Sequence, residues 1–220
     1  MIRAAIFDLD GTLVDSLPGI ARGLNRALES HGHPPHPEDR IRTFIGDGSW
    51  VLAQRGLGDG ASEAEIEEIE AAFVHEYAET WREGTHLYPG IRELLEDLHR
   101  GGLPLAVLSN KPHRFTVEIV DTLFDWVPID ATLGQREGIP RKPDPTGALQ
   151  IAGQLALPPE VVAFVGDSTI DFETATAAGM QPLLVSWGFH SAEQLTATAA
   201  PLVHSCRELR KCLPTPDPAG

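Results

Sequence analysis

Short apolar runs that alternate with helical patterns are the feature that most restricts how this chain can fold. The apolar runs lie at residues 3–8, 103–109, 161–166 and 182–186. Helical spacing of apolar residues appears at 91–98, 115–123, 146–155 and 172–178. Parallel strands need long crossover connections, which are usually helices. The alternation therefore predicts an α/β fold with a Rossmann-like parallel sheet covered on both faces.

Residues 18–83 interrupt this alternation, because they contain helical patterns and no convincing strand. Ile20, Leu24 and Leu28 follow helical spacing, and an acidic amphipathic helix is predicted after Ser62. The apolar stripe of that helix consists of Ile66, Ile69, Phe73, Tyr77 and Trp81. We interpret it as the packing face of a small helical bundle. The sequence thus predicts a core of residues 1–17 and 84–213, an inserted all-helical cap at 18–83, and a loose tail at 214–220.

The charge of the chain restricts the partners that it can bind. The formal net charge is −15 over 220 residues, so non-specific binding to nucleic acid or to anionic membranes is not expected. No stretch approaches the roughly 20 apolar residues of a membrane span, and the first apolar run is too short for a secretory signal. We expect a cytoplasmic protein without membrane association, of undetermined oligomeric state. An anionic substrate would need local positive charge, and the chain has three lysines, at 111, 142 and 211.

Two carboxylates follow the first predicted strand directly. Asp8 and Asp10 are separated by one residue, and Gly11 then permits a sharp turn. Ligands of open α/β sheets bind outside the carboxyl ends of the strands, so these carboxylates can converge on one small volume. An acidic turn that caps the next helix is the alternative, and it would be favoured if this pair stood alone.

Polar side chains at later strand ends and loops change that balance. Ser109 and Asn110 stand at the end of the second apolar run, and both can donate hydrogen bonds to a phosphate oxygen. Lys142 lies in a loop stiffened by prolines, which holds a point charge suited to phosphate. Asp167 and Asp171 follow the third run and add two carboxylates where the first pair should lie. Together these residues predict one site at the carboxyl edge of the sheet.

These segments resemble the four motifs of the haloacid dehalogenase-like phosphatases, in their order and spacing. The matching sequences are DLDGTLVDS at 8–16, SNK at 109–111, RKPDP at 141–145 and GDSTID at 166–171. The resemblance implies a Rossmann-like core with a helical cap inserted after the first strand. Within this superfamily the chain is most similar to the phosphoglycolate phosphatases, with FIGDG at 44–48, SNKP at 109–112, VGDS at 165–168 and AGM at 178–180 as further matching segments.

The resemblance and the charges imply the same chemistry. Asp8 is expected to attack phosphorus and form an aspartyl-phosphate, which divides hydrolysis into two easier steps. Asp10 is expected to protonate the leaving alkoxide and then to take a proton from the attacking water. A phosphate dianion cannot enter a group of carboxylates unless a hard cation offsets them, so Mg²⁺ is expected as cofactor. Its ligands would be Asp8, Asp167 and the backbone carbonyl of Asp10, with Asp171 orienting the metal shell.

The substrate is expected to be a small-molecule phosphate ester, with 2-phosphoglycolate the leading candidate. Ser109, Asn110 and Lys142 would hold its phosphoryl oxygens. The cap loop Gly46-Asp47-Gly48 is predicted to close on the substrate, although a plain turn between helices fits the sequence equally well. The carboxylate of this substrate would need a cationic or amide partner, which amides near Gly46-Asp47-Gly48 or a cap arginine could supply. The candidates are Arg22, Arg26, Arg40, Arg42 and Arg55.

Several alternatives stay open at this point. Asp10 argues against a dehalogenase, whose leaving halide needs no proton, and a cap without lysine argues against a phosphonatase. A sugar phosphomutase, a sugar phosphatase, a nucleotidase or a pyrophosphatase could share the same core motifs. A non-catalytic regulatory module would be expected to lose Asp8 or Asp10, and both are present.

Overall fold

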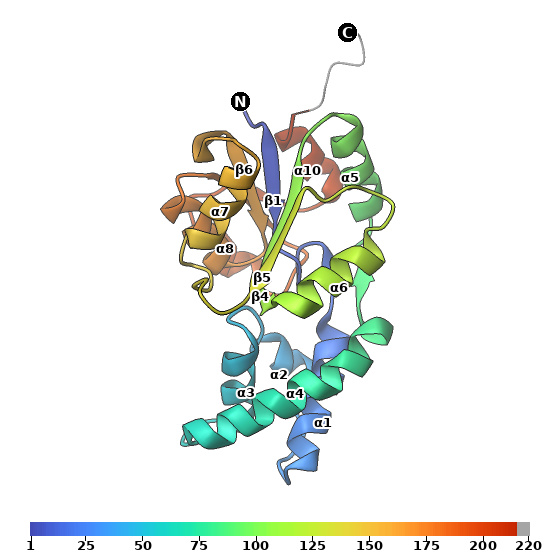
Figure 1. Ribbon diagram of the computed structural model, residues 1–220, viewed down its shortest axis with the longest axis vertical. Coiled ribbons are helices and arrows are strands. Elements are labelled where there is room, and N and C mark those ends of the chain that lie inside the picture. Colours follow the sequence, from blue (N-terminus) through green and yellow to red (C-terminus); the bar gives the residue numbers. More distant parts are fainter. Residues whose placement is uncertain (215–220) are drawn as a thin grey trace. The chain divides into compact units, whose positions relative to one another are not determined.

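The computed structural model describes residues 1–214, which form two compact units (Figure 1). The first unit consists of Met1–Leu13 together with the chain from Leu87 onwards, and the second of Val14–His86. The chain passes from one unit to the other at two places, and each place has a two-residue strand. These strands, β2 (Val14–Asp15) and β3 (His86–Leu87), pair with each other. Of the predicted tail, residues 215–220 lie outside the described residues.

The first unit is built on a six-stranded sheet with the order β5-β4-β1-β6-β7-β8, in which all neighbouring strands are parallel. The strands are β1 (Ala4–Phe7), β4 (Leu105–Pro112), β5 (Ala131–Gln135), β6 (Val162–Gly166), β7 (Gln181–Val185) and β8 (Leu202–Val203). Strand β1 lies between β4 and β6, and all four of its side chains are buried. The predicted Rossmann-like α/β fold is confirmed.

Helices cover both faces of this sheet. They are α5 (Ile91–Arg100), α6 (His113–Leu123), α7 (Thr146–Gln154), α8 (Thr169–Ala177), α9 (Ala192–Thr196) and α10 (Cys206–Cys212). One buried cluster joins alternate strand residues such as Ile6 and Phe164 to Ile151 of α7 and Ala175 of α8, so these two helices pack on one face. Helices α5 and α6 lie on the other face (Figure 1).

The second unit is helical, as predicted for the inserted cap. It contains α1 (Leu17–Ser30), α2 (Glu38–Arg42), α3 (Ser49–Leu57) and α4 (Glu63–Gly84). Helix α4 begins at a capping box, in which the Ser62 hydroxyl accepts from the Glu65 N–H and the Glu65 carboxylate accepts from the Ser62 N–H. The predicted apolar stripe of α4 is buried throughout. Helices α1 and α4 approach so closely that a side chain at Gly84 would collide with the Gly19 backbone.

Hydropathy along the helices bears on membrane insertion. Among the described residues, no helix combines the length and the apolar character that crossing a membrane requires.

Candidate active site

The predicted site residues of the core gather at the carboxyl ends of three adjacent strands. Asp8 directly follows β1, Ser109 and Asn110 lie near the end of β4, and Asp167 directly follows β6. Because β1 stands between β4 and β6, the chain leaves β1 on one side for β4 and reaches β6 later on the other. This reversal of strand order is where open α/β sheets form ligand-binding crevices.

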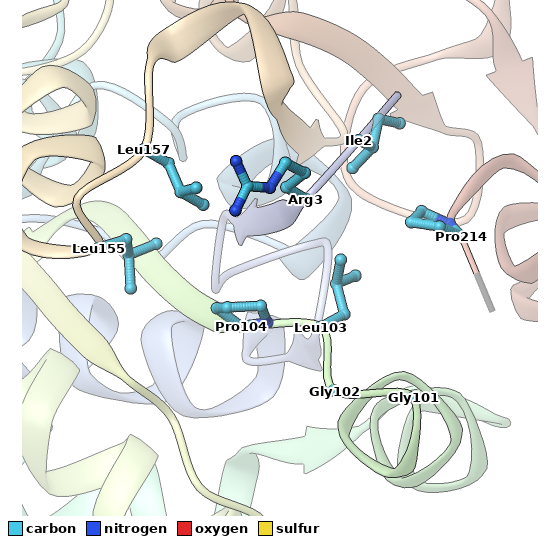
Figure 2. Close-up of a pocket in the computed structure, with 9 residues that line it drawn as sticks. All are labelled: Ile2, Arg3, Gly101, Gly102, Leu103, Pro104, Leu155, Leu157 and Pro214. Carbon is cyan, nitrogen blue, oxygen red and sulfur yellow. The ribbon is translucent and has the colours of Figure 1, made fainter. Parts of the chain in front are cut away.

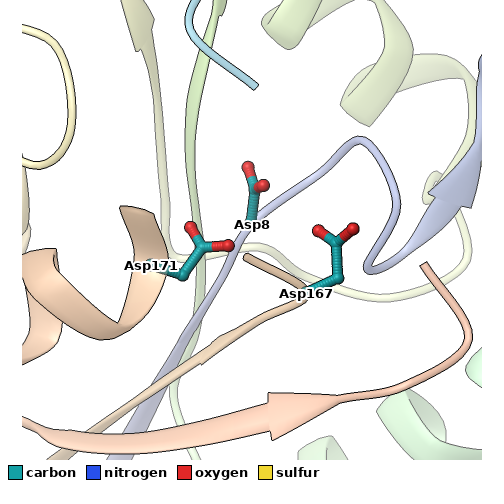
Figure 3. A group of neighbouring side chains, drawn as sticks. All are labelled: Asp8, Asp167 and Asp171. Carbon is teal, nitrogen blue, oxygen red and sulfur yellow. The ribbon is translucent and has the colours of Figure 1, made fainter. Parts of the chain in front are cut away.

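Three buried carboxylates form the centre of the site. Asp8, Asp167 and Asp171 each offer one oxygen, and these oxygens all lie within 4.8 Å of one another (Figure 3). Asp171 comes from the first turn of α8, while the other two follow strands. Three of the four residues predicted to bind metal are thus brought together by the fold.

Lys142 supplies positive charge to this carboxylate group. Its Nζ lies 2.9 Å from Oδ1 of Asp8 and 2.7 Å from Oδ1 of Asp171, and its side chain is 4% exposed. Burial alone would lower the pKa of Lys142, but the charges of Asp171 and Asp8 outweigh burial and raise it. The ammonium group therefore stays charged at every physiological pH.

One lysine does not neutralise three buried carboxylates. Burial raises the pKa of the Asp8 carboxyl well above its ordinary value, against the opposing charge of Lys142. Burial and the charge of Asp171 raise the pKa of Asp167 to about 7. Both raised pKa values show that the charged forms of these carboxylates lack sufficient positive charge nearby. Clustered, buried carboxylate oxygens are also the ligands that hard divalent cations prefer, so these residues fit such an ion.

Asp10 lies in the same region but has a different ionic partner. Its Oδ2 is 2.9 Å from Nζ of Lys111, whose side chain is 5% exposed. From the sequence, Lys111 is one of three lysines and part of a motif, and no role in the site is predicted for it. The available signal was the scarcity of lysine, because Lys111 is one of three lysines in the chain and stands beside a predicted strand end. The prediction that the backbone carbonyl of Asp10 binds metal stays a prediction.

Asp171 is fixed by the start of helix α8. Its Oδ2 accepts from the Ser168 N–H at 3.1 Å and from the Ser168 hydroxyl at 2.6 Å, while Ser168 Oγ accepts from the Asp171 N–H. This capping box engages Oδ2 and leaves Oδ1 directed at Lys142. The local sequence thus uses one carboxylate both to begin a helix and to hold the lysine.

Asp167 is enclosed by the loops after β1 and β7, and no sequence pattern predicts its contacts with them. Its Oδ2 accepts from the Phe189 N–H at 2.7 Å, and its Oδ1 accepts from the Thr12 hydroxyl at 3.2 Å. A side chain at Gly11 or Gly188 would collide with the Asp167 carboxyl group. The loop after β7 therefore belongs to the site, and the strand-end rule could have found it had it been applied to β7.

Ser109 and Asn110 are both buried beside this group. Ser109 Oγ accepts from the Lys111 N–H at 3.2 Å. The Asn110 side chain bonds to the backbone of Lys142, with its Nδ2 donating to the carbonyl at 3.0 Å and its Oδ1 accepting from the N–H at 2.8 Å. The predicted role of these residues as phosphate ligands stays a prediction.

The predicted cap loop lies in the second unit, between α2 and α3. Gly46 and Gly48 adopt positive φ angles of 126° and 90°, which glycine favours. Asp47 forms an ion pair with Arg55 at 2.6 Å. The prediction that this loop closes on the substrate stays a prediction.

A cavity of about 460 Å³ lies at the amino ends of the strands (Figure 2). Arg3, just before β1, and Pro104, just before β4, mark this end. Among the described residues that line it, Arg3 is the one ionisable side chain, and the others are apolar or glycine. These described residues offer no group of acids, bases or nucleophiles for catalysis.

Comparisons with known proteins agree with this geometry. A curated phosphoglycolate phosphatase from Pseudomonas putida KT2440 is 36% identical over 228 aligned positions, which cover 99% of this chain and 81% of the relative. A crystal structure from Lactobacillus delbrueckii subsp. bulgaricus superposes with a TM-score of 0.90 at 31% identity, covering 96% of this chain and 97% of the other. One from Haemophilus somnus 129PT gives 0.88 at 30% identity, with the same coverage. For both proteins, phosphoglycolate phosphatase activity is itself a prediction.

A family model covers most of the chain as well. The model of the haloacid dehalogenase-like hydrolases matches residues 2–179, which include all four motifs and the helical insert. The family predicted from the motifs is thereby confirmed, and the chain belongs to the haloacid dehalogenase-like hydrolases.

Proposed function

We propose that the chain is a magnesium-dependent phosphatase that hydrolyses a small phosphate monoester through an aspartyl-phosphate on Asp8. The observation that carries the proposal is the buried group of Asp8, Asp167 and Asp171 with Lys142 between two of its members. A nucleophilic carboxylate, a cation-binding site and a fixed ammonium group are the parts that phosphoryl transfer needs at one point.

Asp8 has the geometry of a fixed nucleophile. Its Oδ1 accepts from the Leu9 N–H at 2.7 Å and lies 2.9 Å from Lys142 Nζ, so the orientation of the carboxylate is set. In the first step a carboxylate oxygen of Asp8 attacks phosphorus, and the bond from phosphorus to the ester oxygen breaks. In the second step water attacks the same phosphorus, which releases inorganic phosphate and restores Asp8.

Asp10 is the candidate for moving the proton in both steps. It stands two residues after the nucleophile, and its carboxylate is held 2.9 Å from the Lys111 ammonium. In the first step Asp10 gives a proton to the leaving alkoxide, and in the second it takes one from the attacking water. Such acid–base catalysis contributes about 10²- to 10⁴-fold to the rate.

The charge balance of the site supports a bound divalent cation. With every group ionised, its four aspartates and two lysines carry a net charge of −2, which one divalent cation would offset. Asp8, Asp167 and Asp171 are the residues that would hold it. Mg²⁺ bound there would neutralise phosphate charge as the phosphoryl group approaches. Lys142 would offer its ammonium, and Ser109 its hydroxyl, to the phosphoryl oxygens.

The substrate that we propose is 2-phosphoglycolate. Support comes from the curated relatives that carry the name phosphoglycolate phosphatase, at up to 36% identity over nearly the whole chain. Within the second unit, three of the five candidate arginines already have acidic partners: Arg22 with Glu83, Arg26 with Glu76, and Arg55 with Asp47. The first two pairs are largely exposed and hold the guanidinium groups weakly, so they leave those arginines available to a substrate carboxylate.

A kinetic panel tests the proposal. The purified chain is assayed with p-nitrophenyl phosphate, 2-phosphoglycolate, sugar phosphates, nucleoside monophosphates and pyrophosphate, each with Mg²⁺ and with excess chelator. Turnover is expected with Mg²⁺ and not with chelator, and kcat/KM should be highest for 2-phosphoglycolate. If kcat/KM for 2-phosphoglycolate is at least tenfold below that for a sugar phosphate, transition-state binding differs by about 1.4 kcal/mol. That result would reject 2-phosphoglycolate as the substrate but not the assignment as a phosphatase. Full activity in chelator would reject the magnesium mechanism.

A further inference from the structure

The side chain of Asn110 is engaged with a neighbouring loop of the core. Its Oδ1 accepts from the Lys142 N–H at 2.8 Å, and its Nδ2 donates to the Lys142 carbonyl at 3.0 Å. Because one partner is a donor and the other an acceptor on the same residue, the orientation of the amide is fixed. Both bonds are buried, where an unmade hydrogen bond costs about 1–3 kcal/mol.

The loop that contains Lys142 needs such an anchor. Lys142 lies between β5 and α7, in an irregular segment whose isolated bridge joins Arg136 and Ile139 and does not include Lys142. A lysine side chain has four rotatable bonds, so the place of its ammonium depends on where the backbone is held. Asn110 holds that backbone from the end of β4, a strand in the sheet interior.

The other end of Lys142 lies at the centre of the site. Its Nζ is 2.9 Å from Asp8 and 2.7 Å from Asp171. One amide on β4 therefore fixes the backbone of a residue whose ammonium contacts the carboxylate after β1 and the one on α8. An error of about 1 Å in a group of this kind can cost about 10²-fold in rate.

We propose that Asn110 is a positioning residue that acts through Lys142, and that it is not a ligand of the phosphoryl group. The inference rests on the proposed function, and it reassigns one residue that the motif pattern alone places among the phosphate ligands. The amide oxygen and one of the two amide N–H groups bind the Lys142 backbone, so we assign the contribution of Asn110 to catalysis to the position of the Lys142 ammonium.

The scarcity of lysine gives a direct test. With three lysines in the chain, ¹³C-lysine labelling yields three ¹³Cε signals, which Lys142→Met and Lys211→Met assign. In the phosphate-free protein, Asn110→Ala is expected to move the Lys142 signal away from its wild-type position. A phosphate ligand without a positioning role leaves that signal unchanged, and this result would overturn the inference. Asn110→Ser is a milder second variant that serves if the alanine variant does not fold.

A matched control separates the specific effect of Asn110 from a general loosening of the chain that follows Ser109. Thr116 is buried, and its hydroxyl donates to the carbonyl of Lys111 at 3.2 Å without contacting Lys142. Thr116→Val removes a buried side-chain-to-backbone bond from the same segment and should leave the Lys142 signal in place. Equal movement of that signal in both variants would reject a specific role of Asn110.

Kinetics provide a second measurement on the active enzyme. Asn110→Ala is expected to lower kcat/KM by up to about 10²-fold in the wild-type background. In the Lys142→Met background the same change should alter kcat/KM by less than about threefold, because no ammonium remains to be positioned. Equal fold-losses in both backgrounds would contradict the inference. Absence of turnover by the wild type would instead reject the proposed function, and the lysine signals would still decide the role of Asn110.

Discussion

Lys142 is the residue on which the charge balance of the site most depends. It lies between two buried carboxylates, and their attraction outweighs the cost of burying an ammonium group. Removing one partner of a buried ion pair is costly, because the remaining charge is left without compensation. We propose that the same ammonium group contacts the phosphoryl oxygens, so Lys142 contributes to both stability and catalysis.

Replacement of Lys142 by methionine should therefore lower both the stability of the fold and the catalytic rate. The variant keeps the length of the side chain but leaves Asp8 and Asp171 without their ammonium partner. We expect kcat/KM to fall by about 10²- to 10³-fold and the metal-free protein to lose about 3–5 kcal/mol in urea unfolding. Lys211→Met is the control, because Lys211 is exposed on α10 and should change neither value. Unchanged kcat/KM in Lys142→Met would remove the residue from the mechanism.

Substitutions of the two aspartates after β1 should have different effects on the reaction. Asp8→Asn removes the nucleophile, so neither turnover nor a covalent intermediate is expected. Asp10→Asn keeps the nucleophile and should slow both steps by about 10²- to 10⁴-fold, with phosphoenzyme accumulating if the second step suffers more. Intact-mass measurement after rapid mixing with p-nitrophenyl phosphate detects the added phosphoryl group. Its appearance on any residue other than Asp8 would contradict the assignment.

At this scale the sequence identifies the site residues better than it identifies their contacts. The rule that parallel strands share one carboxyl edge was sufficient to bring Asp8 and Asp167 together, and the stiffened loop with its motif added Lys142. It could not show that Lys111 contacts Asp10, or that the Asn110 amide bonds to a backbone 32 residues away. These contacts depend on side-chain direction and on the path of an irregular loop, and neither leaves a periodic signal.

At the scale of elements, the loop after β7 shows how backbone shape serves the site. Gly188 brings this loop against Asp167, and the next residue donates its N–H to the same carboxylate. Trp187 closes the arrangement, because its indole N–H donates to the Thr12 carbonyl at 3.0 Å. The loops after β1 and β7 thus hold Asp167 from two sides.

A side chain at position 188 should disturb this arrangement. Gly188→Ala would push against the Asp167 carboxyl group, so we expect weaker Mg²⁺ binding, measured as a smaller rise in melting temperature at a given Mg²⁺ concentration. Gly153→Ala is the control, because a methyl group there meets open space on helix α7 and should be neutral or stabilise by up to about 1 kcal/mol. Equal Mg²⁺ responses in the two variants would show that the loop does not position Asp167.

Long or strongly apolar elements were predicted, and short ones were not. The four apolar runs and the helices with a clear stripe were found within a few residues of their bounds. Strands β5 and β8 and the short helices α2, α3 and α9 were not identified. Strand β5 lies at the sheet edge with two half-buried positions, and β8 has two residues, so neither carries a sustained apolar pattern. Helix α2 has five residues, too few to show a periodicity of 3.6.

At the scale of the whole molecule, the buried carboxylates link folding to pH and to metal. The pKa of Asp167 is about 7 in the folded chain and about 3.9 in an unfolded one, so the folded state binds this proton more tightly. The stabilisation from this group is fully present below about pH 4 and is lost as the pH rises through about 7. A cation bound to the ionised carboxylates would reverse the loss.

As the pH rises, the unfolding free energy of the metal-free protein should therefore fall, while the stabilisation added by metal should grow. Without metal, Asp167 should make the wild type lose up to about 1.4 kcal/mol per pH unit between pH 5.5 and 7.5, relative to Asp167→Asn. Mg²⁺ at a hundred times its dissociation constant adds about 2.7 kcal/mol, and this increment should grow over the same range because the ion competes with the proton. Urea unfolding of the wild type and of Asp167→Asn, with chelator and with Mg²⁺, measures these differences. Groups that titrate alike in both proteins do not contribute to the difference between them. A metal increment that is independent of pH, or that persists in Asp167→Asn, would place the cation elsewhere than on this carboxylate.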